Sequence, residues 1–361
     1  MNNYEKKLFW SLVKYDNDCI DESLFEYDTP EVLGYLFFNR MQGVAYGVLK
    51  KNKATNKINR EFRNSLKNSF EINLERNNSY YYCVKYLSDL LANTDGKIAF
   101  LKGAKLCFQY PEGYRTSNDV DLLVSPEDIS NVGDLLLSEN FKQGYIKDGA
   151  FLPATRSEII SSKMLRGETV PYIKEVNLPR LKYLEVDINF SLDYKNSNNF
   201  ALNEMIKSIE TDEMNLPSLS RYDFLIHLCV HLYKEATTLP WVKMQRDMTL
   251  YKYEDIYMLV NRISEKDIIP FWERAERLSL HKECAFAISQ TYDLFQLEKD
   301  NWSKKAQSYL KEDEDFLHTV VSPADKKIYI YKNKNVYKRF FDKNRINNLQ
   351  EQQTRSVDIS V

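Results

Sequence analysis

The sequence predicts an α+β protein in which a mixed β-sheet with flanking helices lies between N- and C-terminal helical regions. Strand and helix patterns alternate from residue 97 to 192, whereas apolar residues recur at helical spacing on both sides of that segment. Glycine and proline number only 10 each among 361 residues, against 25 Tyr and 19 Phe. This composition is typical of a helix-rich chain with few loops.

The first 95 residues are expected to form an N-terminal helical region, with helices over 5–15, 30–51 and 55–91. Thr29 followed by Pro30 is a helix start, because proline suits the first turn and threonine caps it. Asp95 and Gly96 then turn the chain.

Residues 96–195 form the predicted α/β core. It should contain strands over 98–101, 119–124, 141–146, 169–176 and 183–190, a helix after Gly103, and a helix over 126–139. A C-terminal helical region is expected over 196–320, with helices at 222–233, 253–262, 269–278 and 282–295. The segment 321–361 is expected to be a basic tail, partly disordered, with an amphipathic helix over 336–345.

The charge balance does not favour a nucleic-acid-binding protein, because 50 Lys and Arg face 52 Asp and Glu. The start of the chain lacks the apolar segment of a signal peptide, and no run is long enough to cross a membrane. We therefore expect a cytoplasmic protein without a membrane partner.

Two carboxylates, Asp119 and Asp121, stand two residues apart in a segment that otherwise reads as a buried strand. Side chains at this spacing lie on one face of a strand, where two carboxylates repel each other unless a cation lies between them. Mg²⁺ is often held by one or two carboxylates together with substrate phosphates. The pair therefore predicts metal-dependent phosphate chemistry, and a solvated strand edge is the simpler alternative.

A possible anion site precedes this pair. The apolar run 98–101 leads into Lys102, Gly103 and the start of a helix, where exposed N–H groups and the helix dipole favour a phosphate. Arg115 lies shortly before the carboxylates and could clamp a phosphate in a bidentate manner, although a solvated side chain is equally consistent with its position.

Several runs of the sequence together resemble a known family. They are LKGAKL at 101–106, YPEGYR at 110–115, DVDLLV at 119–124 and FKQGY at 141–145. These runs resemble the bacterial uncharacterised nucleotidyltransferase family of the DNA polymerase beta superfamily. The pattern R-x-S-x-D-x-D at 115–121 is also similar to nucleotidyltransferase-like toxins of abortive-infection systems.

The resemblance implies a nucleotidyltransferase fold and a third carboxylate on a later strand. In the family this strand reads acidic-x-His followed by an aromatic residue, so Asp187 aligns best and Asn189 stands in place of the histidine. Glu185 lies on the same strand face and is the second choice. The chain also has Ala104 where the wider superfamily has serine or glycine, so backbone N–H groups would have to contact the triphosphate there.

The activity implied by the resemblance is Mg²⁺-dependent transfer of a nucleoside monophosphate from a nucleoside triphosphate, expected to be ATP, with release of pyrophosphate. The near-neutral charge favours a small-molecule or peptide acceptor. An RNA-modifying or tRNA-modifying toxin and a non-catalytic nucleotide-binding scaffold are the alternatives. The predicted catalytic and metal-binding residues are Asp119, Asp121 and Asp187, and the predicted nucleotide-binding residues are Lys102, Gly103, Arg115 and Ser117.

His227 and His231 lie four residues apart and therefore face the same side of one predicted helix. This spacing suits a metal site or a histidine pair beside the nucleotide. No third ligand is evident in the sequence, so zinc binding is not favoured and packing in the core is the simplest interpretation.

Overall fold

The computed structural model describes residues 1–92, 94, 96–192, 199–311 and 313–352. Its internal contacts divide the chain into two compact units. We call Ser65–Phe224 the sheet unit and Met1–Asn64 with Leu225–Val361 the helical unit. The sheet unit includes the whole of the predicted core segment 96–195.

Within the described residues, the sheet unit contains an eight-stranded mixed sheet with the strand order β4-β3-β5-β6-β2-β1-β8-β7. The pairs β2–β6 and β1–β8 are parallel, and the other pairs are antiparallel. Its strands are β1 (Ile98–Phe100), β2 (Asp119–Val124), β3 (Lys142–Lys147), β4 (Ala150–Pro153), β5 (Tyr172–Leu178), β6 (Leu181–Asn189), β7 (Glu210–Thr211) and β8 (Pro217–Ser218).

Its helices are α5 (Gly103–Gln109), α6 (Ile129–Ser138), α7 (Arg156–Leu165), α8 (Asn199–Lys207) and most of α4 (Arg60–Leu91). This mixed sheet with flanking helices confirms the predicted α+β class.

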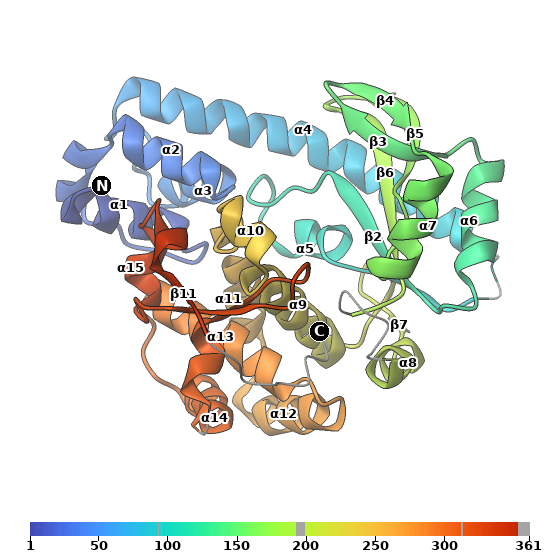
Figure 1. The fold of residues 1–361 in the computed structure, drawn as a ribbon. Helices are drawn as coiled ribbons and strands as arrows, with labels where there is room; N and C mark the ends of the chain where they lie inside the picture. The colour runs from blue at the N-terminus through green and yellow to red at the C-terminus, as the bar shows by residue number, and fades with distance from the viewer. Residues whose placement is uncertain (93, 95, 193–198, 312, 353–361) are drawn as a thin grey trace. The chain divides into compact units, whose positions relative to one another are not determined.

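One face of the sheet packs against α4 and α6 (Figure 1). Alternate residues of β2 and β6 point to this face and are fully buried, namely Val120, Leu122, Val124, Leu184, Val186 and Ile188. They pack with Tyr80, Val84 and Leu87 of α4. Because neighbouring residues of a strand point to opposite faces, the acidic residues of both strands lie on the other face.

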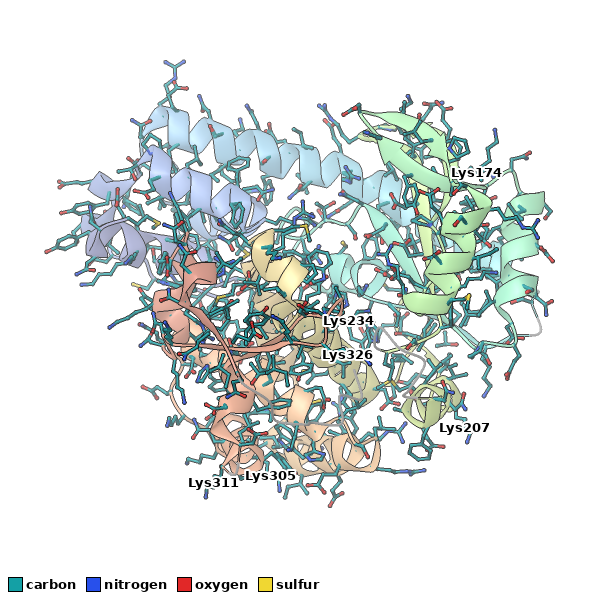
Figure 2. All side chains as sticks on the ribbon, in the orientation of Figure 1. Lys174, Lys207, Lys234, Lys305, Lys311 and Lys326 are labelled. Carbon is teal, nitrogen blue, oxygen red and sulfur yellow. The ribbon has the colours of Figure 1, made fainter. Side chains whose placement is uncertain are left out.

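Lys174 of β5 helps to attach α4 to the sheet (Figure 2). Its Nζ donates a hydrogen bond of 2.7 Å to the hydroxyl of Tyr86 and lies over the rings of Tyr86 and Phe141. A cation over an aromatic face is attracted by the ring quadrupole. The contact therefore adds a polar link to the apolar packing between α4 and β5.

Ten helices and three short strands make up the described part of the helical unit, apart from the first turn of α4 and several 3₁₀ turns. The helices are α1 (Asn3–Val13), α2 (Pro30–Phe38), α3 (Gln42–Lys51), α9 (Arg221–Ala236, most of it), α10 (Leu239–Lys243), α11 (Leu250–Arg262), α12 (Ile268–Arg277), α13 (His281–Phe295), α14 (Asn301–Leu310) and α15 (Val336–Phe340). The strands β9 (Thr319–Val321), β10 (Ile328–Tyr331) and β11 (Leu349–Glu351) form a small antiparallel sheet.

The single helix predicted over 30–51 is wrong, because the chain forms α2 and α3 with a break between them. Arg40 has a φ of 57°, which ends the α2 hydrogen-bond pattern. The buried Asn39 stabilises the break, since its side chain donates to the Tyr35 carbonyl and accepts from the N–H of Leu250. A contact from residue 250 could not be read from the local sequence.

The helix predicted over 336–345 ends at Phe340, and the following residues pack onto the helical unit. Arg345 is 4% exposed and forms an ion pair with Asp247, which is 1% exposed. Of the segment 321–361 that was expected to be partly disordered, residues 321–352 carry β10, β11 and α15, and 353–361 lie outside the described residues. No described helix is both long and apolar enough to span a membrane.

Candidate active site

Asp119 and Asp121 lie on β2 as the sequence predicts, on the sheet face opposite the apolar core. Asp121 is 6% exposed, and Asp119 at the start of the strand is more accessible. A buried carboxylate needs a partner, because leaving its charge without compensation in a region of low polarity is costly. The two side chains therefore mark a polar site on an otherwise apolar strand.

The parallel pairing of β2 with β6 brings two more carboxylates to this face. In the register of the two strands, Asp119 is opposite Glu185 and Asp121 is opposite Asp187. Neighbouring strands are about 4.8 Å apart, and residues in register on them point to the same face. The four side chains therefore form a cluster that we call the carboxylate square. The square contains both Asp187 and Glu185, so the register alone does not choose between them.

Mutual repulsion is evident in the square. Burial raises the pKa of Asp187 well above its usual value, and the charges of Asp121, Asp119 and Glu185 raise it further. Burial also raises the pKa of Glu185, and the charges of Asp119 and Asp121 raise it further. Carboxyl groups that resist ionisation in this way favour a bound cation.

Lys102 supplies a cation to the square. Its Nζ lies 2.7 Å from Oδ1 of Asp121, and the same oxygen accepts a hydrogen bond of 3.3 Å from Nδ2 of Asn189. Burial by itself lowers the pKa of the Lys102 ammonium, but the ion pair with Asp121 and the charges of Asp119 and Asp187 raise it above its ordinary value. Lys102 is therefore held in its charged form.

Gly103 and Ser117 lie against each other beside the square. A Cβ placed on Gly103 would collide with the Oγ and Cβ of Ser117, so only glycine allows this close approach. The Ser117 hydroxyl donates a hydrogen bond of 2.9 Å to Oδ1 of Asp119. The structure thus brings two predicted nucleotide-binding residues together, and one of them, Ser117, contacts the first acidic residue.

Arg115 is partly buried, and its guanidinium donates to the backbone carbonyl of Thr116. This bond turns the side chain toward its own loop. Phosphate binding by Arg115 stays a prediction. The helix that follows Gly103 has only seven residues, so the helix dipole expected there is short.

Four residues of α4 that the sequence analysis missed hold the loop before β2. They form two pairs with a spacing of four residues, and each donates a hydrogen bond of 2.6–3.0 Å to a main-chain carbonyl of the loop or of the first residue of β2. Asn73, Arg76, Asn77 and Tyr80 donate to the carbonyls of Gly113, Ser117, Arg115 and Asp119, respectively. The polar residues on this helix could have indicated such contacts, but the sequence analysis considered only its apolar residues.

The donor set of the square fits a hard divalent cation such as Mg²⁺. It offers carboxylate oxygens, and neither sulfur nor imidazole takes part. Among the described residues, no group of three or more His, Cys, Asp or Glu side chains is arranged so that it could hold a metal ion. A Mg²⁺ ion bound at the square would therefore need substrate phosphates to complete its coordination.

His227 and His231 lie in the helical unit, on α9. Their rings stack with centroids 6.4 Å apart, and Nε2 of His231 lies 3.4 Å from Oε1 of Glu235. Glu235 also forms an ion pair with Lys252. His227 is 6% exposed, which agrees with the packing that the sequence favours for this residue.

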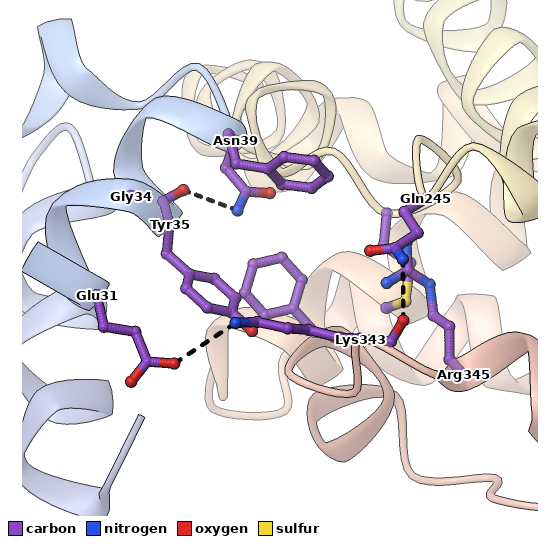
Figure 3. A pocket seen from close by; sticks show the side chains of 10 residues that line it. Glu31, Gly34, Tyr35, Asn39, Gln245, Lys343 and Arg345 are labelled. Atoms are coloured by element: carbon purple, nitrogen blue, oxygen red, sulfur yellow. Dashed lines mark hydrogen bonds and ion pairs between the residues drawn. The ribbon is translucent and has the colours of Figure 1, made fainter.

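A separate cavity of about 270 Å³ lies within the helical unit (Figure 3). Tyr35, Phe38 and Phe340 contribute aromatic walls, and an ion pair of 3.7 Å joins Glu31 to Lys343. Its remaining lining residues are Gly34, Asn39, Gln245, Met248 and Arg345. Its lining includes one carboxylate, that of Glu31, whereas the square has four, so the square is the better candidate for catalysis.

Comparison with known proteins identifies the family of the chain. A family model described as uncharacterised nucleotidyltransferase matches residues 26–296, a range that contains the whole carboxylate square. No curated protein matches the chain. The chain belongs to the uncharacterised nucleotidyltransferase family, and nucleotidyl transfer is the general activity that this membership supports.

Proposed function

We propose that the protein is a Mg²⁺-dependent enzyme that transfers a nucleoside monophosphate from a nucleoside triphosphate, with ATP the expected donor, to an acceptor nucleophile. The observation that carries this proposal is the register of β2 and β6, which gathers four carboxylates beside one lysine. In a non-catalytic scaffold, the repulsion between these carboxylates would only destabilise the fold. In an enzyme, the same negative charges would bind the metal of a metal–triphosphate complex.

In this proposal, Asp119, Asp121 and Asp187 hold the metal, which neutralises negative charge on the triphosphate when bound. Lys102 binds the phosphates as a point charge, and Arg115 offers a guanidinium. Ser117 contributes a hydroxyl, and Gly103 leaves room for it. These groups lower the barrier by stabilising charge that develops during transfer.

The chemical step joins the acceptor oxygen to the α-phosphorus and breaks the bond from that phosphorus to the bridging oxygen of pyrophosphate. Asp187 takes the proton that the acceptor hydroxyl loses, and pyrophosphate departs with the bonding electrons.

We favour a small-molecule or peptide acceptor, because the chain carries 50 basic and 52 acidic residues and so has no excess positive charge to attract a long polyanion. An RNA or tRNA acceptor is the second candidate. The run from Arg115 to Asp121, which is similar to nucleotidyltransferase-like toxins, supports it.

The test is to incubate the protein with each α-³²P-labelled nucleoside triphosphate, Mg²⁺ and fractions of a cell extract. We expect label to move to a product that resists ribonuclease, with release of pyrophosphate and no transfer by Asp121→Asn. Ribonuclease-sensitive label would establish the RNA alternative. Nucleotide binding without transfer to any fraction would establish the scaffold alternative.

A further inference from the structure

The ammonium of Lys102 lies beside the carboxylates that would bind a metal ion. Its ammonium lies 2.7 Å from Oδ1 of Asp121, and the two side chains are 21% and 7% exposed. The negative charges of Asp119 and Asp187 also act on it. In the absence of metal, this lysine is therefore the cation that offsets the repulsion within the square.

The backbone at Lys102 provides a second, independent observation. Its φ is 41° and its ψ is −116°, a conformation that glycine adopts readily and that strains a residue with a Cβ. The preceding residue, Leu101, donates a backbone hydrogen bond to the carbonyl of Asp121. Lys102 thus adopts a strained backbone conformation directly beside β2, and strain of this kind clusters at functional sites.

We infer that Lys102 is a tethered counter-ion that competes with the divalent metal for the carboxylate square and leaves it when a metal–triphosphate arrives. The inference rests on the proposed function. The ammonium and a divalent ion cannot both bind tightly in the square, since the two cations repel each other at close range. A triphosphate removes the conflict, because it offers the displaced ammonium a new anionic partner.

One consequence is that metal and nucleotide bind cooperatively. Metal alone has to displace the lysine without compensation, whereas metal with triphosphate does not. Linkage requires the effect to be reciprocal, so metal must strengthen nucleotide binding by the same factor by which nucleotide strengthens metal binding.

The test measures Mn²⁺ binding to the full chain in the absence of nucleotide, by electron paramagnetic resonance of the free ion. Lys102→Met removes the ammonium and keeps an unbranched side chain of similar length. We expect it to bind Mn²⁺ at least about tenfold more tightly than the wild type, because a repelling charge has gone. In metal-free buffer the variant should unfold at a lower temperature than the wild type, and added Mn²⁺ should raise that temperature more.

Lys105→Met is the matched control. Lys105 lies three residues further along the chain, but its Nζ bonds to Oγ of Ser218 at 2.9 Å and lies over the ring of Phe224. Its replacement should leave Mn²⁺ affinity unchanged. Circular dichroism establishes that each variant is folded.

Folded Lys102→Met that binds Mn²⁺ no more tightly than the wild type would overturn the inference. If the wild type still binds Mn²⁺ together with ATP, the proposed function survives that result. If the wild type binds Mn²⁺ neither alone nor with any of the four nucleoside triphosphates, both the proposed function and this inference are overturned.

Discussion

At the scale of single residues, the two acidic residues of β2 have different surroundings. Asp119 accepts a hydrogen bond from Ser117 and is partly accessible, whereas Asp121 is buried and paired with Lys102. From the sequence alone, replacing either carboxylate would be expected to relieve repulsion and to leave the fold intact or slightly more stable. The ion pair with Lys102 separates the two cases.

We predict that Asp119→Asn and Asp121→Asn both abolish Mg²⁺-dependent nucleotide binding, with opposite effects on stability. Asp119→Asn should leave stability unchanged or slightly higher, because asparagine can still accept from Ser117 and the repulsion falls. Asp121→Asn should lower the free energy of unfolding by about 1–3 kcal/mol, because it leaves a partly buried ammonium without its partner. Calorimetric titration and urea unfolding measure both quantities. Equal stability changes in the two variants would contradict the role of the ion pair.

A second prediction distinguishes the two acidic residues of β6. Asp187→Ala should lower turnover by at least about 10²-fold while changing nucleotide affinity much less, as expected for a residue that acts mainly in the transition state. Glu185→Ala should be mild in comparison. Single-turnover rates with an identified acceptor provide the measurement. A larger loss for Glu185→Ala would move the third carboxylate by two residues along β6.

The raised pKa of Asp187 also predicts a pH dependence. Its carboxyl is harder to ionise in the folded protein than in the unfolded chain, where the ordinary value is 3.8. As pH rises above about 4, the unfolded state loses this proton first, so the metal-free protein becomes less stable until the folded-state pKa is passed. In buffer with a chelator, Asp187→Asn should therefore show a shallower fall in melting temperature between pH 4 and pH 8. Parallel melting-temperature curves for the wild type and Asp187→Asn would show that the Asp187 carboxyl does not cause the pH dependence.

At the scale of elements, the position of the site depends on α4. Its polar row supports alternate carbonyls of the loop that ends in Asp119, while its apolar residues pack on the other side of the sheet. The amphipathic pattern of the helix was visible in the sequence. Its contacts with residues about 40 positions further along the chain were not, because they depend on tertiary packing.

We predict that Asn77→Ala lowers the free energy of unfolding by about 1–2 kcal/mol and weakens nucleotide binding. The substitution removes the donor to the Arg115 carbonyl and loosens the loop that carries Ser117. Asn78→Ala is the matched control, since Asn78 is the next residue of the same helix and is exposed. Chemical unfolding and nucleotide titration of both variants give the comparison. Equal effects from the two substitutions would remove the proposed role of this row.

At the scale of the whole molecule, the C-terminal segment belongs to the helical unit. Arg345 donates from Nε to both carboxylate oxygens of Asp247 at 3.1 and 3.0 Å, and the hydroxyl of Tyr331 donates to the same group. The segment that the sequence predicts as a basic, partly disordered tail thus contains a basic residue that is buried in an ion pair. The charge of Arg345 therefore stabilises the folded structure.

We predict that Arg345→Ala destabilises the protein by about 3–5 kcal/mol, because it leaves the buried Asp247 carboxylate without its partner. Lys343→Ala is the control. Its ion pair with Glu31 is 3.7 Å long and its side chain is 68% exposed, so its loss should cost less than about 1 kcal/mol. Thermal unfolding of the two variants tests the difference. A similar small loss in both would show that the Asp247 pair does not anchor this segment.

Local patterns in the sequence were sufficient for several conclusions. Alternating apolar residues predicted β2 and β6, and the spacing of Asp119 and Asp121 placed both on one face, since a strand repeats every two residues. Apolar residues at helical spacing predicted α9, α11, α12 and α13 with small errors at their ends. Short strands such as β9 and β11, and the helices α7 and α14, lacked a pattern strong enough to predict.

Only the tertiary structure decided which distant residues meet. The parallel register opposes Asp121 to Asp187, 66 positions later, and the turn at Lys102 brings an ammonium to Asp121. Register and turn geometry follow from long-range pairing, which a local sequence pattern does not encode. The sequence by itself therefore determined the fold class and the shared strand face of Asp119 and Asp121, whereas packing between distant segments determined which other charges meet them and which cation balances them.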